Sequence, residues 1–352
     1  MRTIPLFRIA ALGAAALIAS CAPKPAAPGA VIHLRYASPY PPNHPFSRAD
    51  IAWIKKVEAD SAGRLKIDAF WGGETISSDQ TAFEVRHGVA DIALVMPIYQ
   101  RAGVQTVKTQ TGFYTGADTP AEQVAVYHCL QRAFPRLDEE MAGLRVLAVQ
   151  GGSLSRIVTR NRPVRTLEDL RGLRLRAPVE VAPVLKRLGA DPVTMPMGEV
   201  YSAMSKGSID GVIAPWDTLK TLHFSEVGRY VNNLKFARGG YPARAISTKT
   251  YQALPPDLRA ILDRDGPFWE QSLADEVTRA EADGAAFGRG HGIVFIDPTP
   301  ADQARLRQIE NEAAMEDARK LDRYGVPGAQ IFDATQRFIA NIRRGEPACN
   351  TP

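Results

Sequence analysis

One structural unit occurs twice in this sequence, and it constrains the fold more than any other feature. A helical stretch ends at a glycine, two residues and an aspartate follow, and an apolar strand comes next, once over residues 88–95 and again over residues 207–213. Helices that alternate with short buried strands are typical of α/β layers with a mainly parallel sheet. Gly-x-x-Asp alone is common, so coincidence is the alternative, but the flanking elements agree as well. The sequence therefore predicts two similar α/β lobes whose strand ends face each other across a cleft.

The remaining segments extend this pattern along the chain. In the first half we expect a strand, a Pro-rich turn, a helix, a strand and a helix that begins at a capping box, over 31–37, 38–45, 46–61, 65–69 and 77–88. The second half predicts a strand at 173–176 and helices at 181–188 and 198–206. The C-terminal part is mostly helical, with helices expected at 255–284, 300–325 and 327–344 and a strand at 292–296.

The N-terminus has the features of an export signal. Arg2 and Arg8 give the N-terminus a positive charge, and the apolar run that follows, 9–19, is too short to cross a bilayer but fits a signal-peptide core. The run ends in a sequence that resembles the lipobox of bacterial lipoproteins, in which Cys21 carries the lipid; a plain cleaved signal with an incidental cysteine is the alternative. We therefore expect a signal peptide at 1–20, a lipidated Pro/Ala-rich tether at 21–30, and a periplasmic protein that is anchored to a membrane by lipid alone.

Several classes of function are excluded by what the sequence lacks. Lys and Arg exceed Asp and Glu by 43 to 38, but the basic residues are spread along the chain, which argues against nucleic-acid binding. The six histidines are scattered without metal-ligand spacing, and residues 151–155 do not match a GxSxG nucleophile elbow. The glycine-rich segment 288–292 precedes a strand, so it does not match a dinucleotide fingerprint. These features predict a binding protein without catalytic residues, metal or cofactor.

Two cysteines remain after residue 21. Cys129 and Cys349 belong to an exported chain, where a pair can form a disulfide. One interpretation is a bridge that ties the C-terminal tail to the helix near residue 129. The other is a buried thiol and a separate, frayed chain end.

At residues 161–178 and 199–211 the sequence resembles the signature blocks of the solute-binding subunits of tripartite ATP-independent periplasmic (TRAP) transporters, the DctP family. Gly63-Arg64 before a strand, and Gly88 with Asp91, are similar to the N-terminal lobe of that family, and the resemblance extends over about 31–344. It implies a two-lobed fold of the class II periplasmic-binding-protein type, with a ligand cleft and helices between the lobes. Lobe I is expected to comprise 31–153 and about 241–281, and lobe II 154–240 and about 282–345.

The resemblance also assigns site residues. Arg176 falls on the strand-end arginine that forms a salt bridge to the ligand carboxylate, for which a planar guanidinium fork is suited, and Arg156 on a second arginine that often assists. Ala214 stands where the family often carries an asparagine. The weaker candidates are Trp216, which either lines the cleft or packs in the core or hinge, and Met96, Tyr241, His44 and Glu74.

The function implied by the resemblance is that of a receptor. The protein is expected to bind a small organic acid, with an aromatic or apolar body if Trp216 lines the cleft, and to deliver it to a TRAP permease. The alternatives are a ligand-binding partner of a sensor kinase, a receptor for a different uptake system, and an exported enzyme on a binding-protein scaffold.

Overall fold

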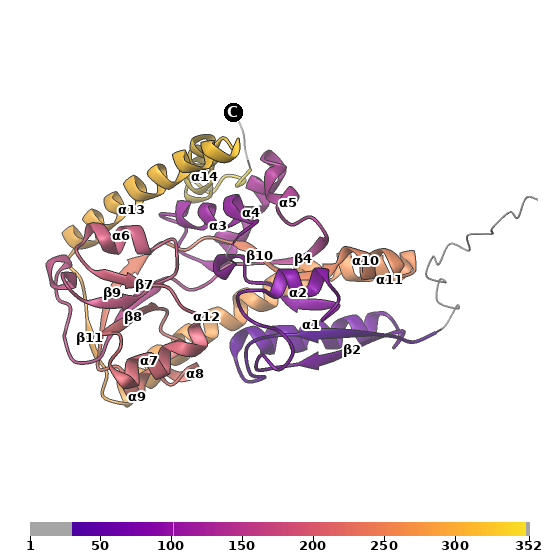
Figure 1. The fold of residues 1–352 in the computed structure, drawn as a ribbon, viewed down its shortest axis with the longest axis horizontal. Coiled ribbons are helices and arrows are strands. Elements are labelled where there is room, and N and C mark those ends of the chain that lie inside the picture. Colours follow the sequence, from indigo (N-terminus) through magenta and orange to yellow (C-terminus); the bar gives the residue numbers. More distant parts are fainter. Residues whose placement is uncertain (1–29, 101, 350–352) are drawn as a thin grey trace, which may run out of the picture.

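The computed structural model describes residues 30–100 and 102–349, which form two lobes, each built on one sheet (Figure 1). The signal peptide and the lipidated cysteine expected from the sequence lie outside these residues. The sheet of lobe I has the order β2-β1-β3-β10-β4. Its strands are β1 (Ile32–Ala37), β2 (Leu65–Phe70), β3 (Ile92–Leu94), β4 (Leu144–Gln150) and β10 (Tyr241–Ser247). β1 runs parallel to both β2 and β3, whereas β10 is antiparallel to β3 and β4.

The sheet of lobe II has the order β11-β9-β5-β8-β6-β7. Its strands are β5 (Ser155–Thr159), β6 (Arg174–Arg176), β7 (Asp191–Val193), β8 (Gly211–Ala214), β9 (Tyr230–Phe236) and β11 (Val294–Ile296). β6, β7 and β8 are parallel, and β5 is antiparallel to β8 and β9. The prediction of two α/β lobes is confirmed, and the antiparallel strands show that each sheet is mixed.

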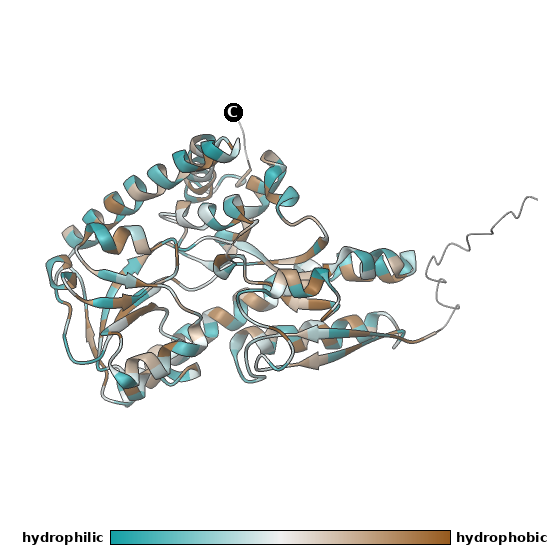
Figure 2. Cartoon of the chain, viewed as in Figure 1, coloured by the Kyte–Doolittle hydropathy of each residue, from teal (hydrophilic) through white to brown (hydrophobic). Residues whose placement is uncertain are grey.

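Helices cover both sheets, and their residues alternate between hydrophilic and hydrophobic along outer helices such as α13 (Figure 2). The α-helices are α1 (Pro45–Asp60), α2 (Thr81–Arg86), α3 (Gln105–Thr109), α4 (Pro120–Ala133), α5 (Arg136–Glu139), α6 (Ala182–Arg187), α7 (Val200–Lys206), α8 (Thr218–Thr221), α9 (Phe224–Val227), α10 (Thr248–Ala253), α11 (Pro256–Arg264), α12 (Gly266–Gly290), α13 (Pro300–Lys320) and α14 (Gly328–Arg343). Short 3-10 helices are η1 (Pro97–Tyr99), η2 (Gln110–Phe113), η3 (Leu167–Leu170), η4 (Met197–Glu199) and η5 (Leu321–Tyr324). No helix within these ranges combines the length and apolarity needed to cross a membrane.

The start of α2 differs from the expected capping box. The helix begins at Thr81, and the side chain of the N-cap residue, Gln80, makes no capping hydrogen bond. Instead, the carboxylate of Glu84 accepts hydrogen bonds from the main-chain N–H and the hydroxyl of Ser77, at 3.0 Å each. The polar residues before α2 therefore stabilise the turn that leads into the helix, which moves the helix start to residue 81.

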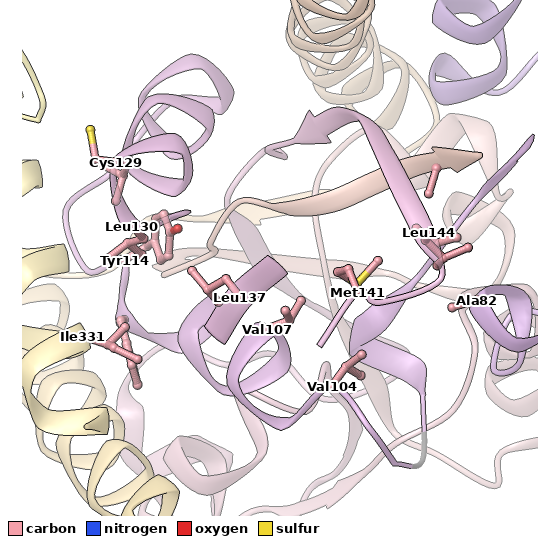
Figure 3. Packing of buried hydrophobic residues seen from close by; sticks show 14 of the residues in the cluster. Ala82, Val104, Val107, Tyr114, Cys129, Leu130, Leu137, Met141, Leu144 and Ile331 are labelled. Carbon is pink, nitrogen blue, oxygen red and sulfur yellow. The ribbon is translucent and has the colours of Figure 1, made fainter. Parts of the chain in front are cut away.

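The C-terminal helix belongs with lobe I, although 282–345 was expected in lobe II. Ile331, Phe332 and Phe338 of α14 pack into the same core cluster as Val107 and Leu130, and Figure 3 shows Ile331 in this cluster with residues of α4 and α5. The reason is that α13 itself spans both lobes: Leu306 packs in the core of lobe II, whereas Ala318 packs in the core of lobe I. α14 then buries its apolar face against α4.

A disulfide links the segment after α14 to lobe I. Cys129 of α4 and Cys349 after α14 are bonded, so of the two interpretations open at the sequence level the structure has the bridge. The bridge closes a loop with a sequence separation of 220 residues. It therefore ties the end of the described chain to the helices of lobe I.

Helix α12 runs from one lobe to the other (Figure 1). Its 25 residues span about 37 Å at 1.5 Å per residue. At the lobe I end, Trp269 stacks on Trp53 with ring centroids 3.7 Å apart. At the lobe II end, a Cβ on Gly284 would lie 2.2 Å from the carbonyl oxygen of Trp216, so only glycine allows this close approach.

A buried polar network connects α12 to the strand ends of lobe I. The carboxylate of Asp50 accepts hydrogen bonds from Arg244 (2.9 Å), Trp269 (2.8 Å) and the Tyr36 hydroxyl (2.5 Å). Arg244 also donates to the side-chain oxygen of Gln150. Asp50 and Arg244 are fully buried, so these hydrogen bonds help to offset the desolvation of the ion pair.

Candidate ligand-binding site

A chamber lies between the lobes, at the edge where the parallel strands β1, β3, β6 and β8 end. The loops that carry the chain from one lobe to the other, after β4 and after β9, complete its wall. Its cavity volume of about 60 Å³ is several times the room that one water molecule needs. The lining comprises Tyr40, His44, Phe46, Met96, Ile98, Tyr99, Thr111, Gly152, Ser153, Ser155, Arg176, Pro178, Glu180, Met197, Ile213, Pro215, Asp217, Thr218, Leu222, Ala237, Arg238, Gly239, Tyr241 and Val277.

Arg176 brings a buried positive charge into this chamber. It is the last residue of β6, and only 1% of the residue is exposed. Its Nε donates to the carbonyl oxygen of Met195 (3.0 Å), and Nη2 donates to the hydroxyl of Tyr99 (2.8 Å). Among the described residues, no acidic side chain forms an ion pair with it. The bond to Tyr99 joins the lobes, because Tyr99 belongs to lobe I.

Arg238 is a second cation in the chamber, and the sequence reasoning missed it. It lies in the loop between β9 and β10, directly before Gly239 and Gly240. A Cβ on Gly152 would lie 2.3 Å from the Arg238 guanidinium, so the glycine lets the two inter-lobe loops pack against each other. The only sequence signal was an arginine followed by two glycines shortly before Tyr241.

Aromatic side chains of lobe I form much of the remaining wall. The rings of Tyr40 and His44 stack with centroids 4.0 Å apart, and Phe46 contacts both of them edge-on. His44 caps α1 by accepting a hydrogen bond from the N–H of Phe46 at 3.2 Å. Burial lowers the pKa of His44 to about 3, and the nearby arginines add to the effect, so the ring is neutral. The Tyr241 hydroxyl accepts a hydrogen bond from Gln150 (3.0 Å), which connects the chamber to the Asp50 network.

Two carboxyl groups also face the chamber. Burial raises the pKa of Asp217 to about 6, against the opposing influence of Arg238. Burial likewise raises the pKa of Glu180, while its own main-chain N–H and the charges of Arg238, Arg176 and Lys108 act in the opposite direction. The chamber therefore combines arginines and carboxyl groups in a mostly aromatic and aliphatic wall.

Four of the seven expected ligand-binding residues line the chamber. These are Arg176, Met96, Tyr241 and His44. Glu74 does not, because it is exposed in the loop after β2.

Arg156 is buried just outside the chamber lining. It pairs in register with Ala214, and its guanidinium lies 4.8 Å from the centre of the Trp216 ring. Nη1 donates to the carbonyl oxygen of Leu154 at 2.6 Å. Desolvation lowers its pKa, and the nearby carboxylates, first that of Glu281, counteract this. In this structure Arg156 therefore supports the loop after β4.

Trp216 faces away from the chamber. Its indole N–H donates to Asn233 (3.2 Å), and its ring packs edge-on against Phe295 at 6.0 Å. Its neighbours Pro215 and Asp217 line the chamber, because the chain turns here from the end of β8 into α8 and directs the Trp216 ring toward Asn233 and Phe295 instead. Of the two interpretations left open for Trp216, the structure has the core and hinge position.

The described residues contain no group of three or more His, Cys, Asp or Glu side chains that could hold a metal ion. What the site offers is a buried cation, a second cation and aromatic surface. A guanidinium of this kind binds planar oxyanions through parallel hydrogen bonds.

Sequence comparison gives the following relatives. A family model described as DctP, bacterial extracellular solute-binding protein, family 7, matches residues 36–320. A solute-binding protein of Albidiferax ferrireducens is 23% identical over 270 residues, which are 74% of this chain and 78% of that protein. An uncharacterized Haemophilus influenzae protein is 27% identical over 166 residues, 46% of this chain; the match spans 49% of that relative, about half its length.

Solved structures share the fold. A TRAP solute-binding protein of Rhodoferax ferrireducens with copurified benzoate has a TM-score of 0.83 at 22% identity, and the match covers 90% of this chain and 99% of that one. One from Bordetella bronchiseptica with bound mandelate has a TM-score of 0.80 at 20% identity, covering 90% and 100%. One from Sulfitobacter with bound β-D-galacturonate has a TM-score of 0.70 at 16% identity, covering 86% and 99%.

The family match covers most of the chain, and the two-lobed fold with an inter-lobe chamber agrees with it. The chain belongs to the DctP family of bacterial extracellular solute-binding proteins, the solute-binding subunits of TRAP transporters.

Proposed function

We propose that this protein is an uptake receptor for a small organic acid with an aromatic or apolar body, whose carboxylate binds to Arg176. The observation that carries the proposal is the buried guanidinium of Arg176, which has no acidic partner at ion-pair distance among the described residues. Burying a charge without a counterion is costly. A ligand carboxylate supplies that counterion, so binding relieves the cost and gains charge-assisted hydrogen bonds.

The shape of the chamber supports an aromatic or apolar ligand body. Phe46, Tyr40 and Met96 present apolar surface that a ring or a branched chain covers on binding. Burial of about 150 Å² of aromatic surface contributes roughly 4 kcal/mol at 25 cal/mol per Å². The benzoate and mandelate bound by two proteins of the same fold agree with this class, whereas the galacturonate of a third shows that the fold also takes sugar acids.

In this proposal Arg238 is the second cation that binds the ligand carboxylate. It lines the chamber where Arg156 does not, and its charge reaches both Asp217 and Glu180. Ala214 offers no amide, so a second cation beside the carboxylate replaces the missing polar contact. Trp216 acts indirectly, because its backbone packs on α12 and positions Pro215 and Asp217 in the wall.

The location of the protein and its delivery of the ligand are proposed from its membership of the family. In this proposal the chain is exported, anchored through a lipid on Cys21, and presents its ligand to a TRAP permease. The Pro/Ala-rich segment 22–29 then serves as the tether. Binding without turnover completes the proposal, which assigns the protein no enzymatic activity.

A thermal-shift screen tests the proposal. The chain lacking residues 1–21 is heated with aromatic and aliphatic mono- and dicarboxylates, 2-oxo acids and sugar acids, since a ligand of the native state raises the melting temperature. Aromatic or branched monocarboxylates are expected to give the largest shifts, and recovery of unchanged ligand shows that no turnover occurs. Shifts with sugar acids alone would refute the apolar ligand body, and no shift with any acid would refute the receptor assignment.

A further inference from the structure

Glu180 is a chamber residue whose chemistry the carboxylate clamp does not use. It lies between β6 and α6, where its segment meets lobe I; a Cβ on Gly112 would be 3.4 Å from the Cβ of Glu180. Its Oε2 atom is buried and has no hydrogen-bond partner, and among the described residues no cation forms an ion pair with it. Such a buried acceptor is costly when it lacks a donor. The chamber lining therefore includes a carboxyl oxygen to which the protein supplies no donor.

We propose that Glu180 accepts a hydrogen bond from a hydroxyl group of the ligand, and thereby selects hydroxylated acids over their unsubstituted counterparts. This inference rests on the proposed function, because it concerns the same chamber and the same class of acid. The ligand then carries two polar groups on an apolar body: a carboxylate for Arg176 and a hydroxyl for Glu180.

The charges around Glu180 favour a hydroxyl over an ammonium group as the donor. Arg238, Arg176 and Lys108 all lie close enough to act on this carboxyl group. Asp217 is the other carboxyl group of the lining, and the positive charge of Arg238 acts to lower its pKa. A ligand ammonium would add a positive charge beside three cations, whereas a hydroxyl donates its proton to the bond without that repulsion.

A site built to hydrogen-bond a ligand hydroxyl discriminates strongly against the analogue that lacks it, because the acceptor then stays unpaired. The purified whole chain is titrated calorimetrically with matched pairs: the three hydroxybenzoate isomers against benzoate, and mandelate against phenylacetate. We expect the best hydroxylated acid of a pair to bind at least about tenfold more tightly than its unsubstituted partner.

The variants Glu180→Leu and Glu180→Gln locate this preference. Leucine removes the acceptor, so the affinity ratio within each pair should fall to within about threefold, while glutamine retains an oxygen and should keep part of the preference. The ratio is the decisive readout, because the loss of a negative charge strengthens the binding of all carboxylates alike. Glu74→Gln is the matched control: it neutralises an exposed carboxylate outside the chamber and should leave the ratio unchanged.

Two results overturn the inference while the receptor function stands: equal binding within every pair by the unmodified protein, or a full preference retained by Glu180→Leu. Absence of binding by every acid overturns the proposed function and this inference together. Should Glu180→Leu fail to fold by circular dichroism, the pair ratios of the unmodified protein and of Glu180→Gln decide: an unchanged ratio in the glutamine variant counts against Glu180.

Discussion

Replacing Arg176 by alanine should abolish measurable ligand binding and leave the fold intact. A guanidinium has five N–H donors, of which two are taken by Met195 and Tyr99, so three are available to a ligand. Both oxygens of a carboxylate can therefore bind to one edge of the fork. At about 1.5–3 kcal/mol for each bond to a charged group, two bonds contribute about 3–6 kcal/mol, a loss of roughly 10²- to 10⁴-fold in affinity.

The same variant should change stability little. Alanine removes a buried charge that has no acidic partner, which is favourable, and leaves the carbonyl of Met195 and the hydroxyl of Tyr99 without a donor, which is unfavourable. We expect the free energy of unfolding without ligand to stay within about 2 kcal/mol of the original value. Arg176→Lys keeps the charge but loses the fork, and should bind with intermediate affinity.

Isothermal titration calorimetry with the strongest ligand of the screen measures the affinities, and circular dichroism with thermal melting measures the fold. An affinity of Arg176→Ala within threefold of the original would refute the assignment of Arg176 as the carboxylate clamp. A large fall in melting temperature without ligand would show instead that Arg176 mainly supports the structure.

Three further predictions concern stability. Asp50→Ala leaves Arg244 buried without its ion-pair partner, so urea unfolding should show a loss of about 3–5 kcal/mol; a loss below 1 kcal/mol would contradict a buried pair. Burial raises the pKa of Glu310 to about 8, so the folded state binds a proton more tightly than the unfolded state, and stability falls as pH rises from about 5 to 8. Glu310→Gln keeps an acceptor for the N–H of Ala237, so it should be more stable than the original protein at pH 8.5 and similarly stable at pH 5. If denaturant unfolding gave both proteins the same change in free energy of unfolding between these pH values, the buried carboxyl group of Glu310 could not be the cause. Reduction of the Cys129–Cys349 disulfide should cost about 2–5 kcal/mol in melts with and without dithiothreitol, and leave ligand affinity unchanged; an altered affinity would link the bridge to the chamber.

The strands and most helices could be predicted from the sequence because their signals are local. The apolar alternation of β2 and the strand end at Arg176 depend on period 2 and on a following proline. The site residues at strand ends follow from the same logic, since parallel strands of one sheet end at the same edge. Met96 lines the chamber at such a strand end, and so does Arg176, which the resemblance to the family had assigned.

Long-range packing could not be predicted in this way. The position of Arg238 depends on two inter-lobe loops that approach each other at Gly152, and no local pattern encodes that approach. The amphipathic pattern of α14 predicts a helix with one buried face, but it does not say which lobe that face covers. The disulfide was the one signal that assigns it, because Cys129 lies on a helix of lobe I.

Trp216 shows how a one-residue difference changes a site. Ile213 and Pro215 at the end of β8 line the chamber, whereas Ala214 between them does not, and Trp216 in the following turn packs elsewhere. The alternation was present in the sequence, but its phase depends on which face of β8 meets lobe I. Tertiary structure alone fixes that phase.

The most direct test of a carboxylate receptor compares an acid with its methyl ester. The two differ little in shape, but only the acid carries the negative charge that Arg176 requires. Calorimetric titration of the unmodified protein with the best aromatic acid and its ester should give binding of the acid and a loss of at least about 100-fold for the ester. Equal affinities for acid and ester would contradict a chamber organised around a buried arginine.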